Sequence, residues 1–116
     1  MARVKRGVTS HKRHKRLFQE AEGRKGTRRK LVKAAHEAQL HALAYATRDR
    51  KQRKRDMRQL WIIRINAAAR LNGITYGKFI AGLKKADVDL DRKILADLAV
   101  RDAATFGRIA EVARNA

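Results

Sequence analysis

The sequence predicts an all-α protein in which a long basic helical extension precedes a small globular helical domain. The 116 residues include no proline, and most of them are good helix formers. No segment alternates apolar and polar residues as a half-buried strand does. Large apolar residues are scattered thinly in the first half, whereas in the second half they recur at the spacing of one helix face.

The net charge also differs between the two halves of the chain. Residues 1–58 hold twenty Lys or Arg and five acids, a net charge of +15, and residues 59–116 hold ten and six, a net charge of +4. The first half has only two aromatic residues, Phe18 and Tyr45, so its apolar surface is too small to offset the entropy of ordering. We assign residues 1–58 to an extension, formed by an extended segment and a long helix, and residues 59–116 to a domain.

The long helix is expected from Thr27, which suits an N-cap, to Asn72, which precedes Gly73. These 46 residues contain neither Pro nor Gly. As one helix they would span roughly 70 Å, more than a compact domain of this size encloses. The alternative is a break near Thr47 to Asp49, where side chains can bond the local backbone.

Three shorter helices are expected to complete the domain. Thr75 would cap the first of them, which ends near Ala86, and Asp91 and Asp102 would cap the second and third. The expected core consists of the large apolar residues of this half: Leu60, Trp61, Ile62, Ile63, Ile65, Leu71, Ile74, Phe79, Ile80, Leu83, Ile94, Leu95, Leu98, Phe106, Ile109 and Val112. For Trp61, packing in the core is favoured over stacking on a nucleobase.

Composition excludes several classes of protein. The absence of Cys excludes a disulfide framework, a thiolate zinc site, an iron–sulfur cluster and a thiol nucleophile, and suits a reducing compartment. The longest run of large apolar residues, Leu60 to Ile63, is far shorter than the ~20 that cross a bilayer, and the first residues lack the apolar stretch of a secretory signal. No catalytic constellation is recognisable, so we expect no enzyme, no small-molecule substrate and no cofactor.

Two histidine pairs and an aspartate series imitate metal sites without completing one. His11 and His14 have cations around them and no nearby carboxylate, and His36 and His41 are five residues apart, which turns their imidazoles about 140° from each other on a helix. The aspartates at 87, 89 and 91 are followed by Arg92 where a calcium loop needs Gly. We therefore expect no metal ion.

Positive charge is concentrated in three segments. Residues 1–16, 24–33 and 48–58 hold seven, six and seven Lys or Arg, with only Asp49 and Asp56 among them. A solvated helix face would need more acids for its i,i+4 pairs, so phosphate is the natural counterion. Arg outnumbers Lys, which suits bidentate phosphate contacts. Gly23 and Gly26 are interpreted as a hinge that lets backbone approach a phosphate closely.

Four stretches of the sequence resemble the bacterial-type family of ribosomal protein twenty of the large subunit. They are MARVKRG at the start, RDRKQRKR from residue 48, RQLWIIRINAAARLNGITYGKFIAGLKKA from residue 58 and DLDRKILADLAV from residue 89. The resemblance runs essentially from end to end. It departs near Arg24 and Leu31, where aromatic residues are expected in the family. The plane of the Arg24 guanidinium is the expected substitute for aromatic stacking there.

The resemblance implies direct binding to large-subunit ribosomal RNA, contact with neighbouring large-subunit proteins, a role early in subunit assembly and no part in peptide-bond chemistry. It places the protein in a cytoplasmic ribosome, with a plastid or other organellar ribosome as the alternative. The RNA-binding residues that it implies are Arg3, Lys5, Arg6, Lys12, Arg13, Lys15, Arg16, Arg24, Lys25, Arg28, Arg29, Lys30, Arg48, Arg50, Lys51, Arg53, Lys54, Arg55, Arg58, Arg64, Lys78, Lys84, Lys85 and Arg92. For Arg64, an ordinary solvent-exposed position is the equal alternative.

The resulting hypothesis is a scaffold in which the domain folds by itself and the extension becomes helical when ribosomal RNA supplies counter-charge. The rival is a protein that compacts DNA, because neutralising a phosphate backbone does not distinguish DNA from RNA. A membrane-active helix is set aside, since residues 48–58 offer only Met57 as an apolar side chain.

Overall fold

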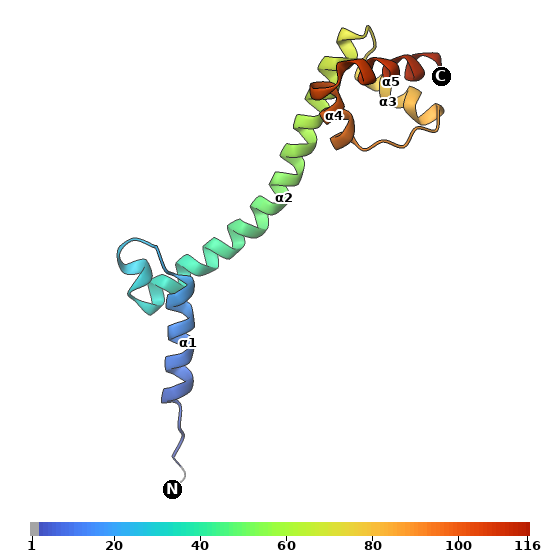
Figure 1. The fold of residues 1–116 in the computed structure, drawn as a ribbon. Helices are drawn as coiled ribbons and strands as arrows, with labels where there is room; N and C mark the ends of the chain where they lie inside the picture. Colours follow the sequence, from blue (N-terminus) through green and yellow to red (C-terminus); the bar gives the residue numbers. More distant parts are fainter. Residues whose placement is uncertain (1–2) are drawn as a thin grey trace. The chain divides into compact units, whose positions relative to one another are not determined.

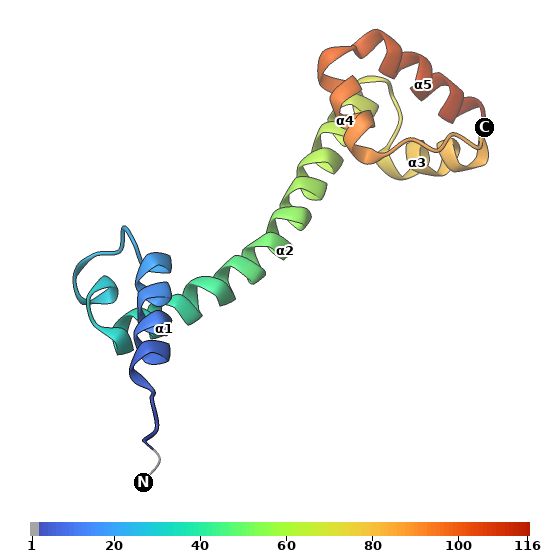
Figure 2. The same cartoon turned by 60° about the horizontal axis from the view of Figure 1, so that its bottom comes forward.

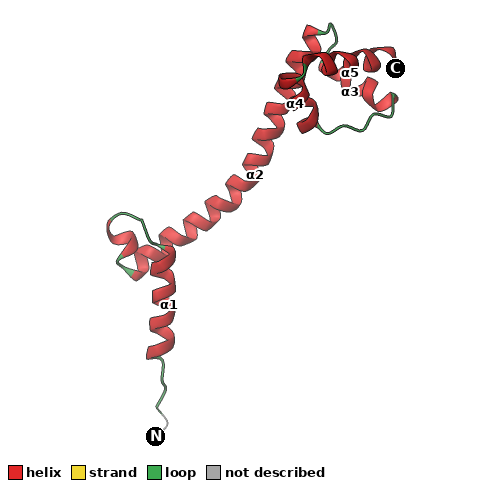
Figure 3. Ribbon diagram, viewed as in Figure 1, coloured by secondary structure: helices red, strands yellow, loops and turns green. Residues whose placement is uncertain are grey.

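The computed structural model describes residues 3–116, and this part of the chain contains helices and connecting segments but no strand (Figure 3). The helices are α1 (Gly7–Glu20), the short 3-10 helix η1 (Gly26–Arg29), α2 (Val32–Leu71), α3 (Tyr76–Lys85), α4 (Arg92–Arg101) and α5 (Ala103–Asn115) (Figure 1). The prediction of an all-α fold is confirmed. The chain forms two compact units, the first ending at Lys51 and the second covering Gln52–Ala116.

The first unit begins with a helix where the sequence analysis expects an extended segment. α1 spans fourteen residues, and its end is marked by the backbone hydrogen bond from Ala21 N to Leu17 O, 3.0 Å. Gly23 then takes a φ of +82°, a conformation that L side chains rarely adopt, and turns the chain back. As a result η1 and the start of α2 lie beside the end of α1 (Figures 1 and 2).

The long helix starts later than expected. Thr27 does not cap it but lies inside η1, and the bond from Leu31 N to Thr27 O (2.9 Å) closes a turn before α2 begins at Val32. Residues 47–49 are helical, so the helix does not break there, and the hydroxyl of Thr47 donates to Leu43 O at 3.1 Å without interrupting it. α2 ends as expected, because Gly73 adopts a φ of +74°.

The core of the second unit is built from all four helices that enter it. Phe79 of α3, Phe106 of α5, Ile65 of α2 and Leu95 of α4 are its largest fully buried side chains. The two phenylalanine rings stack with their centroids 5.2 Å apart. α5 packs against α3 and α4 (Figure 2), and Trp61 packs against this core, as favoured from the sequence.

Five residues that the sequence analysis places in the core are exposed instead: Leu60, Ile63, Leu71, Ile94 and Val112. Small residues fill the buried positions, namely Ala69, Ala96, Ala110 and Ala113. In α5 the buried face follows Phe106, Ala110 and Ala113 at i, i+4 and i+7, which turns Val112 away. Large apolar side chains dominate the sequence pattern, whereas the small residues that let helices approach closely do not stand out in it.

Helices α3 and α5 approach each other very closely at Gly82 of α3. A Cβ atom placed on Gly82 would lie 1.9 Å from the carbonyl oxygen of Ala113 and 2.7 Å from its carbonyl carbon. Real Cβ atoms do not come that near to backbone, so the crossing of α3 and α5 requires glycine here.

The three expected N-caps differ in what their side chains do. Thr75, Asp91 and Asp102 all stand directly before their helices. Only Asp102 uses its side chain: it accepts hydrogen bonds from the backbone N–H of Thr105 at 3.0 Å and from the Thr105 hydroxyl at 2.6 Å. Capping by the side chains of Thr75 and Asp91 was therefore predicted wrongly.

The cap of α5 predicts a pH dependence of stability. Hydrogen bonds from the Thr105 side chain and backbone hold the pKa of Asp102 below its ordinary value. The folded state therefore favours the charged carboxylate, which adds to the free energy of unfolding. This contribution is fully present above the unfolded pKa of about 3.9 and is lost as the pH falls through the lower pKa of the folded state. We expect Asp102→Asn, which keeps an acceptor without titrating, to flatten the fall in melting temperature between about pH 5 and about pH 3. Parallel curves for the variant and the natural chain, measured by circular dichroism, would contradict this.

Candidate nucleic-acid interface

The basic residues predicted to bind RNA are distributed over both units. They lie before and on α1 (Arg3, Lys5, Arg6, Lys12, Arg13, Lys15, Arg16), around η1 (Arg24, Lys25, Arg28, Arg29, Lys30), on α2 (Arg48, Arg50, Lys51, Arg53, Lys54, Arg55, Arg58, Arg64), on α3 (Lys78, Lys84, Lys85) and at the start of α4 (Arg92). All are exposed except Arg24 and Arg92, which are half-buried. Charged groups with this exposure are available to a polyanion.

The densest positive charge lies on a part of α2 that has no packed face. Every residue from Thr47 to Leu60 is exposed. The ion pair that the structure gives within residues 48–58 joins Arg48 Nε to Asp49 Oδ1 at 2.8 Å. The side-chain hydrogen bond from Arg48 lowers the pKa of Asp49, so this carboxylate stays charged near neutral pH. Among residues 3–116, the remaining cations of the segment have no acidic partner and are exposed to solvent.

A groove of about 700 Å³ lies between the turn after α1 and the first half of α2. Arg24, Lys25 and Arg28 line one side of it, and His41 and Tyr45 line the other. The two rings are stacked at a tilt, with centroids 5.9 Å apart, and half of the Tyr45 surface is exposed. Neither aromatic residue is among the RNA-binding residues expected from the sequence, although their i,i+4 spacing on an expected helix is a usable signal.

Arg24 belongs to a hydrogen-bond network rather than to the open surface. Its Nη2 donates to Gln39 Oε1, and Gln39 Nε2 donates in turn to Glu20 Oε2 at 3.0 Å. Arg24 Nη1 is buried and has no hydrogen-bond partner among the described residues. At the position where an aromatic residue was expected, this arginine ties the turn to α1 and α2.

A second groove, of about 460 Å³, lies along α3 and the end of α5 in the second unit. Lys78 and Lys85 line it together with Arg114 of α5, whose guanidinium donates to the backbone carbonyl of Asn72. Lys84 does not line this groove, and Arg92 is held by a hydrogen bond from its Nε to the Tyr76 hydroxyl at 3.0 Å. Sequence reasoning missed Arg114, because only tertiary packing brings it to α3.

Two further findings concern other kinds of site. Among residues 3–116, no three His, Asp or Glu side chains lie close enough together to hold a metal ion. None of the described helices combines the length and apolar character needed to cross a membrane.

The fold and its surface define a class: strongly basic, all-helical proteins whose net charge suits a polyanionic partner. A family model described as "Ribosomal protein L20" matches residues 3–109. A protein of Roseiflexus sp. called "Large ribosomal subunit protein bL20" is 60% identical over 116 residues, covering 100% of this chain and 99% of its own length. A protein of the same name from Chloroflexus aurantiacus is 60% identical, covering 100% of this chain and 98% of its own length. Another, from Acidithiobacillus ferrooxidans, is 54% identical, covering 99% of this chain and 97% of its own length.

The chain belongs to the ribosomal protein L20 family. It is a structural constituent of the large ribosomal subunit and not an enzyme. These relatives are bacterial, which agrees with the expected place in a cytoplasmic ribosome.

Proposed function

We propose that the chain binds large-subunit ribosomal RNA directly and acts early in subunit assembly by bracing RNA segments that are distant in sequence. The observation that supports this most is the stretch of α2 from Thr47 to Leu60, a helix exposed on all sides and charged almost entirely with one sign. Such a helix has no protein surface to pack against. Phosphates on several sides would neutralise it and join their RNA segments through it.

The two parts of the chain have different tasks in this proposal. Residues 1–58 are the RNA-penetrating extension, and residues 59–116 are a domain that folds alone and docks on RNA through Lys78, Lys84, Lys85 and Arg92. The buried apolar residues support the division, because among the described residues before Gln52 only Ala21 and Ala35 are buried. Two alanines contribute little to folding, so the extension orders as it binds RNA.

Neighbouring proteins of the large subunit are the second class of partner. Ile63, Ile94 and Val100 in the second unit are about half exposed or more, although the first two were expected in the core. Large apolar side chains that stay exposed on a charged protein suit contact with another protein.

A competition experiment separates this function from the compaction of DNA. The full chain, at moderate salt, is offered labelled large-subunit ribosomal RNA together with increasing amounts of duplex DNA. We expect ribosomal RNA to remain bound at a large mass excess of DNA. Displacement by an equal mass of duplex would contradict RNA binding as the function and favour the rival.

A further inference from the structure

A third groove, on α1 and the turn after it, combines chemistry that phosphate binding alone does not require. Its volume is about 550 Å³, and it is lined by His11, His14, Lys15, Phe18, Gln19, Glu22 and Arg29. His11, Lys15 and Phe18 follow one another at i, i+4 and i+7 of α1, so they share one face of the helix, and Glu22 lines the groove from the turn after α1. Arg29, the last residue of η1, also lines the groove.

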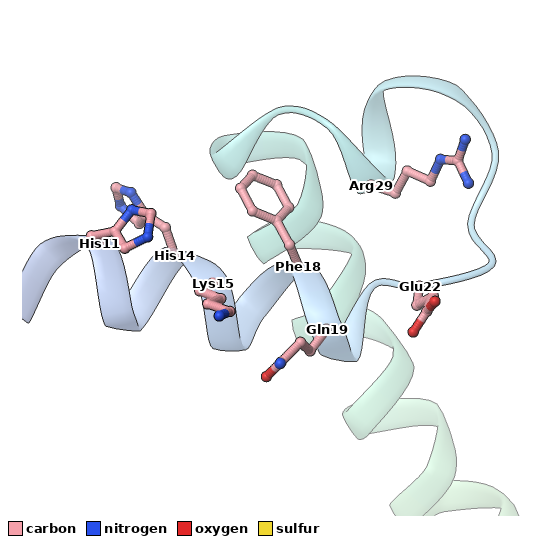
Figure 4. A pocket seen from close by; sticks show the side chains of 7 residues that line it. All are labelled: His11, His14, Lys15, Phe18, Gln19, Glu22 and Arg29. Carbon is pink, nitrogen blue, oxygen red and sulfur yellow. The ribbon is translucent and has the colours of Figure 1, made fainter.

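Phe18 is the first lining residue whose chemistry does not suit a phosphate site. Figure 4 shows its ring rising from α1 on the same side as the two histidine rings. The ring is only half-buried, and it makes no aromatic pair within the described residues. An apolar ring face offers nothing to an anion, whereas it is the usual platform for an unstacked nucleobase.

Glu22 is the second lining residue whose chemistry does not suit a phosphate site. The chain has 30 basic residues and 11 acidic ones, yet one of these acids, Glu22, lines the groove from the turn after α1 (Figure 4). A carboxylate repels phosphate, but it accepts hydrogen bonds from the exocyclic amino group of a base. Lys15 and Arg29 supply positive charge for the phosphates on either side of such a nucleotide.

We propose that this groove holds one unstacked nucleotide of a single-stranded ribosomal RNA segment, with its amino-bearing base stacked on Phe18 and its amino group near Glu22. The inference rests on the proposed RNA-binding function and adds to it a contact with a base. The groove volume leaves ample room for a nucleobase.

The stacking part is tested with Phe18→Leu, which keeps an apolar side chain and removes the ring. The full chain is titrated with oligoadenylate and with an abasic ribose-phosphate oligomer of equal length, at one salt concentration. We expect the variant to bind oligoadenylate roughly five-fold or more weakly and the abasic oligomer unchanged. Phe18→Trp should keep the affinity, and its additional indole fluorescence should be quenched by oligoadenylate but not by the abasic oligomer. Val8→Ala, at an exposed apolar residue of α1 outside the groove, is the matched control and should change neither affinity.

Glu22→Ala tests the hydrogen-bonding part. We expect tighter binding of the abasic oligomer, because a negative charge is removed, together with a smaller preference for oligoadenylate over oligouridylate. If Phe18→Leu weakens both oligomers equally, or neither, or if Glu22→Ala strengthens binding of every oligomer alike, the groove does not hold a base. Failure of the whole RNA-binding function would look different, because the natural chain itself would then lose ribosomal RNA to duplex DNA.

Discussion

Gly82→Ala is expected to lower the melting temperature of the second unit by more than about 10 °C. The new Cβ would overlap the backbone of Ala113, so α3 and α5 must separate and the stacked rings of Phe79 and Phe106 lose contact. Overpacking of this kind costs about 3 kcal/mol, which is a large part of the roughly 3–10 kcal/mol expected for a unit of this size. Thermal unfolding followed by circular dichroism measures the effect.

Gly77→Ala is the matched control, because Gly77 lies in the same helix and a Cβ there meets nothing within 4 Å. Alanine in an open helical position is expected to stabilise the unit by about 0.5–1 kcal/mol. The two variants should therefore move the melting temperature in opposite directions. Equal and small shifts would mean that α3 and α5 are not in close contact at Gly82.

Replacing Arg50, Lys51, Arg53, Lys54 and Arg55 together by Gln is expected to weaken binding to large-subunit ribosomal RNA by roughly 100-fold or more at moderate salt. All five side chains are exposed on α2, and none has an ion pair among the described residues. The slope of the logarithm of the binding constant against the logarithm of the salt concentration should become shallower by about 3.5 to 4.5. Each of the five lost phosphate contacts removes about 0.7–0.9 from this slope. Filter binding over a range of salt concentrations gives both quantities.

A charge-preserving variant of the same five positions, with Lys for Arg and Arg for Lys, separates charge from geometry. We expect it to keep the salt dependence of the natural chain and to lose only a few-fold in affinity, through altered bidentate contacts. A glutamine variant with an unchanged salt dependence would show that this segment does not contact phosphate.

The helix boundaries that the sequence predicted well are those with local causes. Gly73 ends α2 because a left-handed residue is needed there, and Asp102 begins α5 because its carboxylate bonds Thr105. The start of α2 was wrong because Gly26 has a φ of +62° and directs Thr27 into a separate 3-10 turn. α1 was missed because its stability has no strong sequence signal: it buries no residue.

Packing between helices was predicted less well, for a physical reason. A hydrophobic period identifies large side chains, but the contact of α3 with α5 depends on Gly82, Ala110 and Ala113, which contribute little to such a period. The prediction of the nucleic-acid interface was limited in the same way. Exposure of the basic residues follows from their charge, whereas the meeting of Lys78 and Lys85 with Arg114 depends on the fold.

Hydrogen exchange of the full chain, with and without large-subunit ribosomal RNA, tests most directly whether the extension takes its order from RNA. The account predicts that in the free chain at low salt the amides of α1 and of α2 up to Arg58 exchange rapidly, while those around Phe79 and Phe106 are protected. Added RNA should then protect the extension. Strong protection along the whole free chain, unchanged by RNA, would contradict the account.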